Sequence, residues 1–541
     1  MRNATRFADH RRGNLRPSRR HVAVRAAQNR RVRRGLGSSS MADAAGELRL
    51  RTPAGRWVLL ATVLGSGMAM LDGTVVNVAL ERIGRDFGAG FTGLQWTVNA
   101  YTLTLASLIL LGGSLGDRFG RRRVFLIGAV WFALASLMCG LAPNIETLIA
   151  ARALQGIGGA LLTPGSLAII SASFHGRDRG AAVGAWSGLG GIAGAVGPFL
   201  GGWLVGIDWR LVFLLNLPLA VLVIVVAIRH VPETRDPSAA PHLDVIGTVL
   251  AALGLGALTW SLTGLGSGTT PALLVGLVIG VLALVGFVVV ERRSRHPLVP
   301  PDLFADRVFT AANVATLLIY AALGTVFVML VMFLQVVSGF SPLQAGTALL
   351  PVTVIMLLFS ARAGALAQRI GSRIPMTVGP LVSAGGLALM GRIGPDASWL
   401  VDVLPAVVVF GAGLSLTVAP LTSTVLDAAS DRHAGAASGV NNAVARAAGL
   451  LAVAVIPGVA GITGDAYTDP VAFAAGYRVT VWIGAALLVT AALVSFVFVR
   501  TGRTSTPDAA ADPDRFALER CPQCGIDGPL VHPADRADDT P

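Results

Sequence analysis

The sequence of 541 residues has no lysine, only three cysteines, and charged residues at just 13% of its positions. An ordinary globular domain carries about 25% charged residues. Cys139 lies in an apolar stretch, while Cys521 and Cys524 lie near the C-terminus, so the spacing does not fit a disulfide framework. The chain also lacks a GxxxxGKS/T phosphate-binding loop, which argues against transport driven by ATP. Its eight histidines lie mostly outside the apolar segments, which argues against a membrane enzyme.

Hydrophobic residues make up 53% of the chain, and its mean hydropathy is +0.68. From residue 57 to residue 500, apolar runs of about 20 residues alternate with short charged loops, which is the pattern of membrane-spanning helices. We therefore predict an all-α polytopic membrane protein with fourteen transmembrane helices, at residues 57–79, 94–113, 124–142, 147–171, 180–206, 211–229, 244–265, 272–291, 310–336, 343–366, 375–393, 400–426, 438–462 and 477–499.

The positive charge of the chain is concentrated at its N-terminus. Residues 1–40 contain twelve arginines and one acid, Asp9, a net charge of +11 out of the total of +13. Because the remaining +2 is spread over the rest of the chain, we expect no nucleic-acid partner. Residues 1–56 are predicted to be a basic cytoplasmic tail, which is not a secretory signal because it has no apolar core. Two readings stay open: translation starts at Met41, or the tail contacts anionic lipid.

Arginine also sets the expected orientation. The loops after the even-numbered predicted helices carry arginines, such as Arg121 and Arg292, whereas acids such as Glu146 and Asp208 follow odd-numbered helices. The positive-inside rule then places both termini in the cytoplasm. The use of arginine without lysine is typical of a GC-rich bacterial genome, so we expect a multi-pass protein of a bacterial cell membrane.

Residues 501–541 are predicted to be a disordered cytoplasmic tail. This tail contains the sequence CPQCG at 521–525, with His532 beyond it. A structural zinc ion is normally held by four ligands. Because one cysteine pair and one histidine are too few, we expect no metal here.

The sequence contains an internal repeat. FTGLQ at 91–95 recurs as FSPLQ at 340–344, and GSLGDRFGRRR at 113–123 recurs as GALAQRIGSR at 364–373, at offsets of 249 and 251. Nearly equal offsets indicate two homologous halves. We predict two six-helix bundles, at 57–229 and 292–500, separated by a linker and an inserted two-helix hairpin at 230–291. Parallel halves with a site between them near the midplane are a transporter architecture.

The loop GGSLGDRFGRRRVF at 112–125 combines closely spaced glycines with one acid and four arginines. Arginines alone would only set topology, but the GxLxDRxGRR spacing is more specific and resembles the signature loop of the major facilitator superfamily. That resemblance implies the major facilitator fold, with this loop as a gating latch between the halves. The residues concerned are Gly113, Asp117, Arg118, Gly120 and Arg121.

Two charged residues interrupt the apolar runs. Arg152 lies in LIAARALQGIGGALLTPG at 148–165, and an arginine within a span costs roughly 2.5–3.5 kcal/mol unless it is paired or hydrated. Snorkelling to the membrane surface is the alternative. The RxxQGxGG pattern resembles the superfamily's motif of the fourth helix, whose arginine is implicated in proton coupling. Asp72 lies in LDGTVVNVAL at 71–80, and we expect it to face the cavity and exchange protons together with Arg152.

The stretch GPFLGG at 197–202 resembles the superfamily's antiporter motif, carried here by Gly197, Pro198, Gly201 and Gly202. Glycine spacing alone would indicate only close helix packing. Ala193 departs from the fuller motif by a small-for-small change. Further segments at 71–80, 209–220, 333–351 and 438–449 are similar to the fourteen-span drug:proton antiporter family of EmrB/QacA type. Leu211 and Gln368 depart from its pattern, and Gln368 leaves the second-half loop without an acid, which implies asymmetric gating.

Polar residues within the apolar runs are candidates to line a substrate cavity, or else form interhelical hydrogen bonds. They are Asn99, Tyr101, Gln155, Asn313, Gln335, Asn442 and Arg446. The resemblance implies a secondary transporter that exports drugs or other toxic organic compounds, amphipathic or cationic, in exchange for protons by alternating access. The alternative is export of an endogenous metabolite such as an antibiotic or siderophore. The expected partners are a small organic substrate, protons and the lipid bilayer, with a monomeric chain and no cofactor.

Overall fold

The computed structural model describes residues 49–235, 244–266, 268–294, 297, 299–429 and 434–499, and every regular element in these residues is a helix. Residues 1–48 of the tail expected at 1–56 and the whole tail expected at 501–541, with Met41, Cys521, Cys524 and His532, lie outside the described residues.

The helices form two groups. The first group comprises α2 (Pro53–Phe87), α3 (Phe91–Phe119), α4 (Arg121–Gly140), α5 (Ile145–Ser173), α6 (Gly176–Val205), α7 (Leu211–Leu214) and α8 (Asn216–His230). The second comprises α11 (Arg307–Val336), α12 (Pro342–Thr347), α13 (Leu350–Ile370), α14 (Arg373–Met390), α15 (Leu404–Asp427), α16 (Ala434–Val459) and α17 (Pro470–Phe498), with short helical turns at Pro301–Ala305, Trp399–Val403 and Ala466–Thr468. Between the groups in the chain lie α9 (Val245–Leu265) and α10 (Pro271–Arg293).

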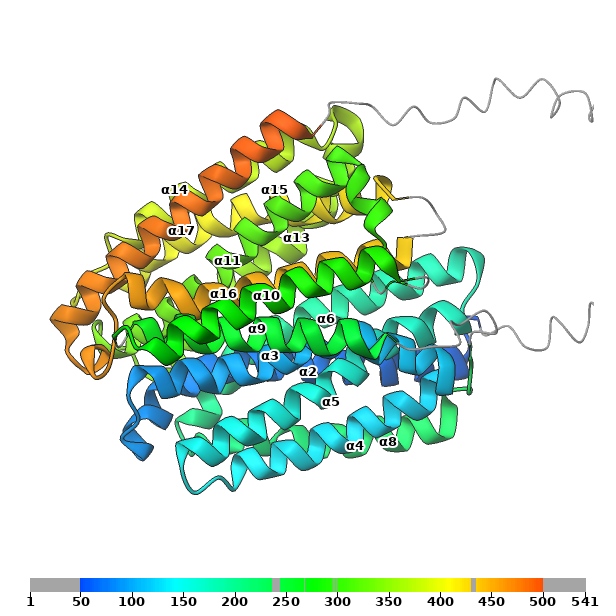
Figure 1. The fold of residues 1–541 in the computed structure, drawn as a ribbon, viewed down its shortest axis with the longest axis horizontal. Helices are drawn as coiled ribbons and strands as arrows, with labels where there is room; N and C mark the ends of the chain where they lie inside the picture. Colours follow the sequence, from blue (N-terminus) through cyan, green and yellow to red (C-terminus); the bar gives the residue numbers. More distant parts are fainter. Residues whose placement is uncertain are drawn as a thin grey trace, which may run out of the picture.

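Figure 1 shows the two groups as two layers of roughly parallel and antiparallel helices, with α9 and α10 lying between the layers in this view. Helix α9 packs against α3 of the first group and α16 of the second, as well as against α10. The hairpin of α9 and α10 therefore contacts both groups.

The described helices include twelve that are long and apolar enough to span a membrane by length and composition. In this set α7 and α8 count as one span, as do α12 and α13. Helices α6 and α14 fall outside it. Large apolar side chains, such as Ile127, Leu282 and Leu493, are more than half exposed on the outside of the bundle, as expected for a surface that faces lipid.

Local sequence explains where α2 begins and ends, and this corrects the predicted span of 57–79. The Thr52 hydroxyl accepts a hydrogen bond from the Gly55 amide and Pro53 occupies the first turn, which is a favourable N-terminus. At the other end Gly88 adopts a left-handed conformation at φ 59°, which ends the helix after Phe87. Because α2 runs eight residues beyond residue 79, Asp72 lies near its middle rather than toward one end.

The repeat seen in the sequence has a counterpart in backbone geometry. Gly120 ends α3 at φ 113°, and Gly371 ends α13 at φ 85°. These two glycines occupy the same place in GDRFG and AQRIG, and positive φ values favour glycine. The same turn is therefore built twice in the chain.

The two groups are tied together at one end of the bundle. We call the end where α2 finishes and α3 begins the Gly88 end, and the opposite end, with the loop between α3 and α4, the Gly120 end. In the described part of the chain, every hydrogen bond between the groups lies toward the Gly88 end. They join Phe91 N to Gly464 O (2.8 Å), Tyr467 Oη to Ala89 O (2.7 Å), Gln95 Nε2 to Val453 O (2.7 Å) and Gln335 Nε2 to Val78 O (3.3 Å).

Candidate functional site

An ion pair between Asp72 of α2 and Arg152 of α5 lies in the interior of the first group. The Arg152 guanidinium donates to Asp72 Oδ2, and the two side chains are 0% and 1% exposed. A buried ion pair costs several kcal/mol of desolvation per ion, which only good geometry and further hydrogen bonds can offset. Each of the two charged residues singled out in the apolar runs therefore has the other as its partner.

Neutral polar groups complete the coordination of the Asp72 carboxylate. Its Oδ1 atom accepts from Gln155 Nε2 (2.8 Å) and from Asn216 Nδ2 (3.0 Å). The same two amides donate to Ser136 Oγ, at 2.8 and 3.3 Å. All of these side chains are fully buried. The Asp72 cluster, comprising Asp72, Arg152, Gln155, Asn216 and Ser136, thus joins four elements: α2, α4, α5 and α8.

The arginine of this cluster is held in a fixed position. Arg152 Nε donates to the Thr97 carbonyl (3.1 Å), and an Nη1 donor reaches Gln155 Oε1 (2.6 Å). The Tyr101 ring lies 4.3 Å from the guanidinium carbon, which is within the range of a cation–π contact. The Tyr101 hydroxyl donates to the Ala69 carbonyl (3.0 Å). Helix α3 therefore covers the ion pair on one side.

Close packing of α3 on α5 depends on glycine. A Cβ atom at Gly156 would lie 2.1 Å from Thr104 Oγ1 and 2.3 Å from the Tyr101 carbonyl oxygen. Thr104 Oγ1 also donates to Ala153 O across the same interface (2.8 Å). Because Gly156 is one residue from Gln155, this approach positions the RxxQG segment against α3.

The GPFLGG segment lies where α6 meets α2 and α12. A Cβ atom at Gly197 would lie 2.0 Å from Thr74 Oγ1, and one at Gly201 would lie 3.1 Å from the Val75 carbonyl oxygen. On the other side of α6, a Cβ atom at Gly202 would lie 2.6 Å from both Leu343 Cα and Pro342 O.

The close approach of α6 and α12 is reciprocal, because a Cβ atom at Gly346 would lie 2.2 Å from the Pro198 carbonyl oxygen. Pro198 and Gly202 therefore lie in a close backbone contact between the two groups near the Gly88 end, whereas Gly197 and Gly201 pack α6 against α2 within the first group.

The loop between α3 and α4 contacts the first group. Asp117 accepts from Arg121 Nε (2.8 Å), and Glu233, just after α8, accepts from the Arg122 amide (3.1 Å). Arg118 lies over the Phe119 ring at 5.2 Å, and Gly113 lies beside Pro164 of α5. Among the described residues, this loop makes no hydrogen bond or ion pair with the second group.

The remaining cavity candidates are distributed between the groups. Asn313 donates to Phe309 O (2.9 Å) and accepts from Asn441 (3.3 Å) within the second group. Gln335 instead reaches across to the Val78 carbonyl of α2. Arg446 donates from Nε to Asn442 Oδ1 (3.2 Å). Asn99 is fully buried, and neither atom of its amide has a hydrogen-bond partner in the described residues.

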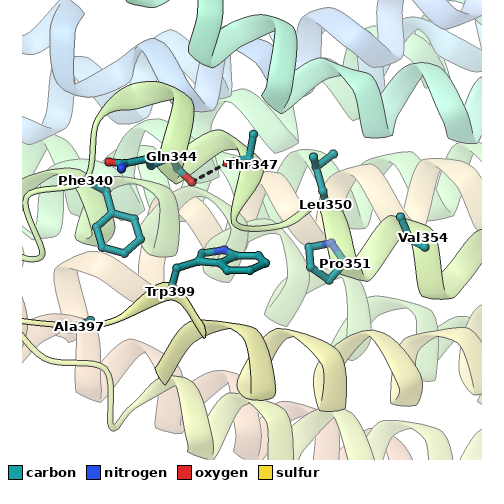
Figure 2. A pocket seen from close by; sticks show the side chains of 8 residues that line it. All are labelled: Phe340, Gln344, Thr347, Leu350, Pro351, Val354, Ala397 and Trp399. Carbon is teal, nitrogen blue, oxygen red and sulfur yellow. Dashed lines mark hydrogen bonds between the residues drawn. The ribbon is translucent and has the colours of Figure 1, made fainter. Parts of the chain in front are cut away.

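A separate cavity of about 810 Å³ lies in the second group near the Gly88 end. Figure 2 shows the Trp399 indole lying between Phe340 and Pro351, with the Thr347 hydroxyl bonded to the Gln344 carbonyl (3.0 Å). None of its lining residues was predicted as a site residue; they are Phe340, Gln344, Thr347, Leu350, Pro351, Val354, Ala397 and Trp399. The described residues contain no group of three His, Cys, Asp or Glu side chains placed to hold a metal ion.

Three residues of this site were not predicted from the sequence. Asn216 and Ser136 bind in the Asp72 cluster, and Glu233 binds the arginine loop. Asn216 carried a signal, because it is a polar residue within the apolar run 211–229 and within the segment 209–220 that resembles the antiporter family. Ser136 and Glu233 carried none, since a serine within a span and an acid in a loop are both ordinary.

Comparison with known proteins gives consistent matches. The model of the Major Facilitator Superfamily matches residues 62–453. The chain is 36% identical to the puromycin resistance protein pur8 of Streptomyces alboniger, over 84% of the chain and 92% of that protein. It is 35% identical to the multidrug resistance protein Stp of Mycobacterium tuberculosis, over 74% of the chain and 75% of that protein. It is 33% identical to the tetracenomycin C resistance and export protein of Streptomyces glaucescens, over 76% of the chain and 77% of that protein.

The fold of the chain resembles those of solved transporter structures. A bacterial homologue of the human lysosomal transporter Spinster matches with a TM-score of 0.60 at 18% identity, over 83% of this chain and 98% of that chain. A transporter of the POT family matches with a TM-score of 0.61 at 15% identity, over 81% and 95% of the two chains.

Proposed function

Because the chain belongs to the major facilitator superfamily, we propose that it is a secondary transporter that exports drugs or other organic compounds across a bacterial cell membrane in exchange for protons. The observation that carries this proposal is the buried pair of Asp72 and Arg152. It places one protonatable carboxylate, with a fixed counter-charge, in the middle of a helix that packs against both groups. Ionisable residues at such depth are typical of proton relays in transporters.

The architecture we propose has fourteen spans. Helices α6 and α14 have 30 and 18 residues, and each packs lengthwise against spans of its own group, α2 for α6 and both α15 and α17 for α14. Adding them to the twelve apolar candidates makes each group a six-helix bundle, over residues 57–229 and 292–500. The hairpin of α9 and α10 is then the insertion between the bundles, at 230–291.

The orientation follows from charge. With the arginine-rich loop after Phe119 on the cytoplasmic side, the Gly120 end faces the cytoplasm and the Gly88 end faces outward. Both tails then lie in the cytoplasm. Because the hydrogen bonds between the groups lie toward the Gly88 end, the described conformation is closed to the outside. Alternating access requires these contacts to open while the Gly120 ends approach one another.

In the opposite conformation, the loop residues Gly113, Asp117, Arg118, Gly120 and Arg121 would latch the second group. In the present conformation, GPFLGG and α12 pack so closely that residues larger than glycine do not fit at the contact. This contact would close the outer side. The two motifs would thus act at opposite ends of the transport cycle. The neutral Gln368 in the second copy of the loop supports an asymmetric latch.

Proton exchange would act on the Asp72 cluster. Protonation of the carboxylate removes its charge, so the attraction to Arg152 is lost while the bonds of Arg152 to Gln155 and Thr97 remain. Binding of a single proton would therefore rearrange the contact between α2 and α5. Asp72 is fully buried in the described conformation, so we assign proton entry to the outward-open state.

A second candidate function is export of a metabolite made by the same cell. Similar proteins include a probable actinorhodin transporter of Streptomyces coelicolor and a cephamycin export protein of Amycolatopsis lactamdurans. These two proteins are named for transport or export of an antibiotic, which supports this alternative. The geometry of the Asp72 cluster serves either substrate class equally.

The proposal is tested by accumulation of a panel of dyes and antibiotics in cells that express the chain. We expect lower accumulation than in cells without it, and an uncoupler should abolish the difference. Everted membrane vesicles then test coupling directly, because substrate uptake should follow an imposed inside-acid pH gradient. Export that persists with the proton gradient collapsed would contradict proton exchange.

A further inference from the structure

Arg446 is a positive charge in the middle of α16 without an acidic partner. The helix has 12 residues before it and 13 after it, so at 1.5 Å per residue it lies about 18 Å from either end, too far to reach the membrane surface. Among the described residues no Asp or Glu lies within ion-pair distance of it. The described acids of the second group lie at helix ends, in short turns or in loops: Asp302, Asp306, Asp396, Asp402, Asp427, Asp465 and Asp469. A guanidinium stays protonated at any physiological pH.

This arginine lies at the boundary between the groups. Helices α3 and α16 run antiparallel, with Gln95 bonded to Val453 and Leu110 beside Gly439. That register places Arg446 level with residues 102–103 of α3. Tyr101 lies one residue before that level on α3, and an added Cβ at Gly449, about one turn after Arg446, would lie 3.8 Å from the Tyr320 carbonyl oxygen of α11. Because the Tyr101 ring also covers Arg152, Arg446 lies beside the Asp72 cluster but outside it.

A second observation on the same boundary points to a ligand. Asn99 is 0% exposed, and both atoms of its amide are unpartnered in the described structure. It lies one turn after Gln95, whose side chain reaches α16, so Asn99 shares the face that meets the second group. Buried amides are rarely left without partners, and each exception asks for an explanation. A polar ligand group at this boundary would provide one.

The balance of charge decides which ligand fits. Asp72 is neutralised by Arg152, so the positive charge of Arg446 at the boundary has no acidic counterpart among the described residues. The guanidinium uses one of its five N–H donors on Asn442, and its planar fork suits a carboxylate. Aromatic rings at Tyr101 and Tyr320 can pack against a conjugated ring system.

We propose that Arg446 and Asn442 of α16, beside Tyr320 of α11 and across the boundary from Tyr101 and Asn99 of α3, bind an anionic group of the exported compound, a carboxylate or phenolate on an aromatic scaffold. This inference rests on the proposed export function and refines its substrate class. It departs from the expectation of a cationic substrate, because a cation would meet an unneutralised positive charge at this point. The proposed anion site and the proton site use different side chains, and Tyr101 lies next to both.

An anionic substrate changes the electrical driving force. Outward movement of one negative charge and inward movement of one proton both follow an inside-negative membrane potential. Each charge moved changes the equilibrium concentration ratio by about fifty-fold per 100 mV. Exchange of a monocation for one proton, in contrast, moves no net charge. Collapse of the potential with the pH gradient intact should therefore strongly reduce export of an anion.

The test uses two dyes that share the xanthene ring system, anionic fluorescein and the cationic tetramethylrhodamine methyl ester. Purified protein in proteoliposomes is assayed for transport of each, and in detergent for binding of each by fluorescence polarisation. We expect the wild type to bind and transport fluorescein in preference to the rhodamine ester. Arg446→Gln should reduce fluorescein binding by about tenfold or more, the scale of one charge-assisted interaction. Arg446→Lys should show a smaller loss, because it keeps the charge without the fork.

Arg362→Gln is the matched control, because Arg362 is an exposed arginine of α13 in the same group that bonds only to its own helix within the described residues. It should leave both dyes unaffected. Equal losses for both dyes in Arg446→Gln, or preference of the wild type for the cationic dye, would overturn the anion site while leaving export intact. Fluorescein binding that depends on Arg446, without any proton-driven transport, would instead retain the anion site and reject the proposed function.

Discussion

Replacing Asp72 with asparagine removes one charge of a fully buried ion pair and leaves the other in place. Asparagine can still accept from Gln155 and Asn216 through its amide oxygen, but its NH2 group would face the Arg152 guanidinium donor to donor. Removing one partner of a buried pair costs about 3–5 kcal/mol because a buried charge is left uncompensated. Asp72→Asn should therefore lose both stability and proton coupling.

The size of the stability loss can be worked out. The pair lies within the first group, residues 53–230, a body in the size range for which 1 kcal/mol shifts the unfolding midpoint by about 2–4 °C. The expected decrease is therefore about 6–20 °C for the purified protein in detergent. Thermal unfolding followed by tryptophan fluorescence measures it.

A double variant separates stability from coupling. Asp72→Asn combined with Arg152→Gln replaces the ion pair with two neutral amides that can hydrogen-bond, so most of the lost stability should return. Transport driven by a pH gradient should stay absent, because no carboxylate remains in the Asp72 cluster. If Asp72→Asn alone unfolds at the wild-type temperature, the buried ion pair does not stabilise the protein and this prediction is refuted. Proton-driven export by the double variant would refute the assignment of Asp72 as the proton carrier.

Three further predictions concern other contacts. Gly202→Val would force a side chain onto Pro342 O, where even a Cβ atom lies at 2.6 Å, so cysteine labelling between α6 and α12 should increase and transport should fall. Glu233→Gln weakens the acceptor of the arginine loop, and we expect slower transport with the unfolding midpoint changed by less than about 4 °C; a larger decrease would make Glu233 mainly structural. Tyr467→Phe loses the bond to Ala89 O. Burial and the nearby acids raise the pKa of the Tyr467 hydroxyl. The wild type should therefore be more stable than Tyr467→Phe by the same free energy of unfolding from pH 6 to 9, and this difference should be lost only above about pH 10. A difference that changes below pH 9 would contradict this.

Hydropathy and the repeat predicted most of the fold. The apolar runs correspond to helices throughout the described residues, and membership of the major facilitator superfamily, predicted from the motif residues, is confirmed. Helix ends were predicted less well. The span containing Asp72 was placed too short, because α2 continues through Glu81 and Arg85, which pair with each other one turn apart.

The partners within the site could not be predicted. Asp72 and Arg152 were each recognised as costly in an apolar run, yet hydropathy says nothing about how α2 and α5 are rotated toward each other. Asn216 was overlooked although it lies in the same kind of run. Gln335 shows the opposite difficulty, since a polar residue expected in a cavity donates to the Val78 carbonyl across the boundary of the two groups. The roles assigned to these residues remain predictions.

Helix α9 contacts both groups: Gly256 lies beside Leu103 of α3, and at Gly266, directly after the helix, an added Cβ would lie 3.1 Å from Gly458 Cα of α16. If the two groups move relative to each other, α9 cannot keep a fixed contact with both of them. One of these contacts must therefore slide or break in every transport cycle, and the other marks the bundle with which the hairpin travels. Cysteine crosslinks at the two contacts would differ in their effect: one would be tolerated, and the other would stop the cycle.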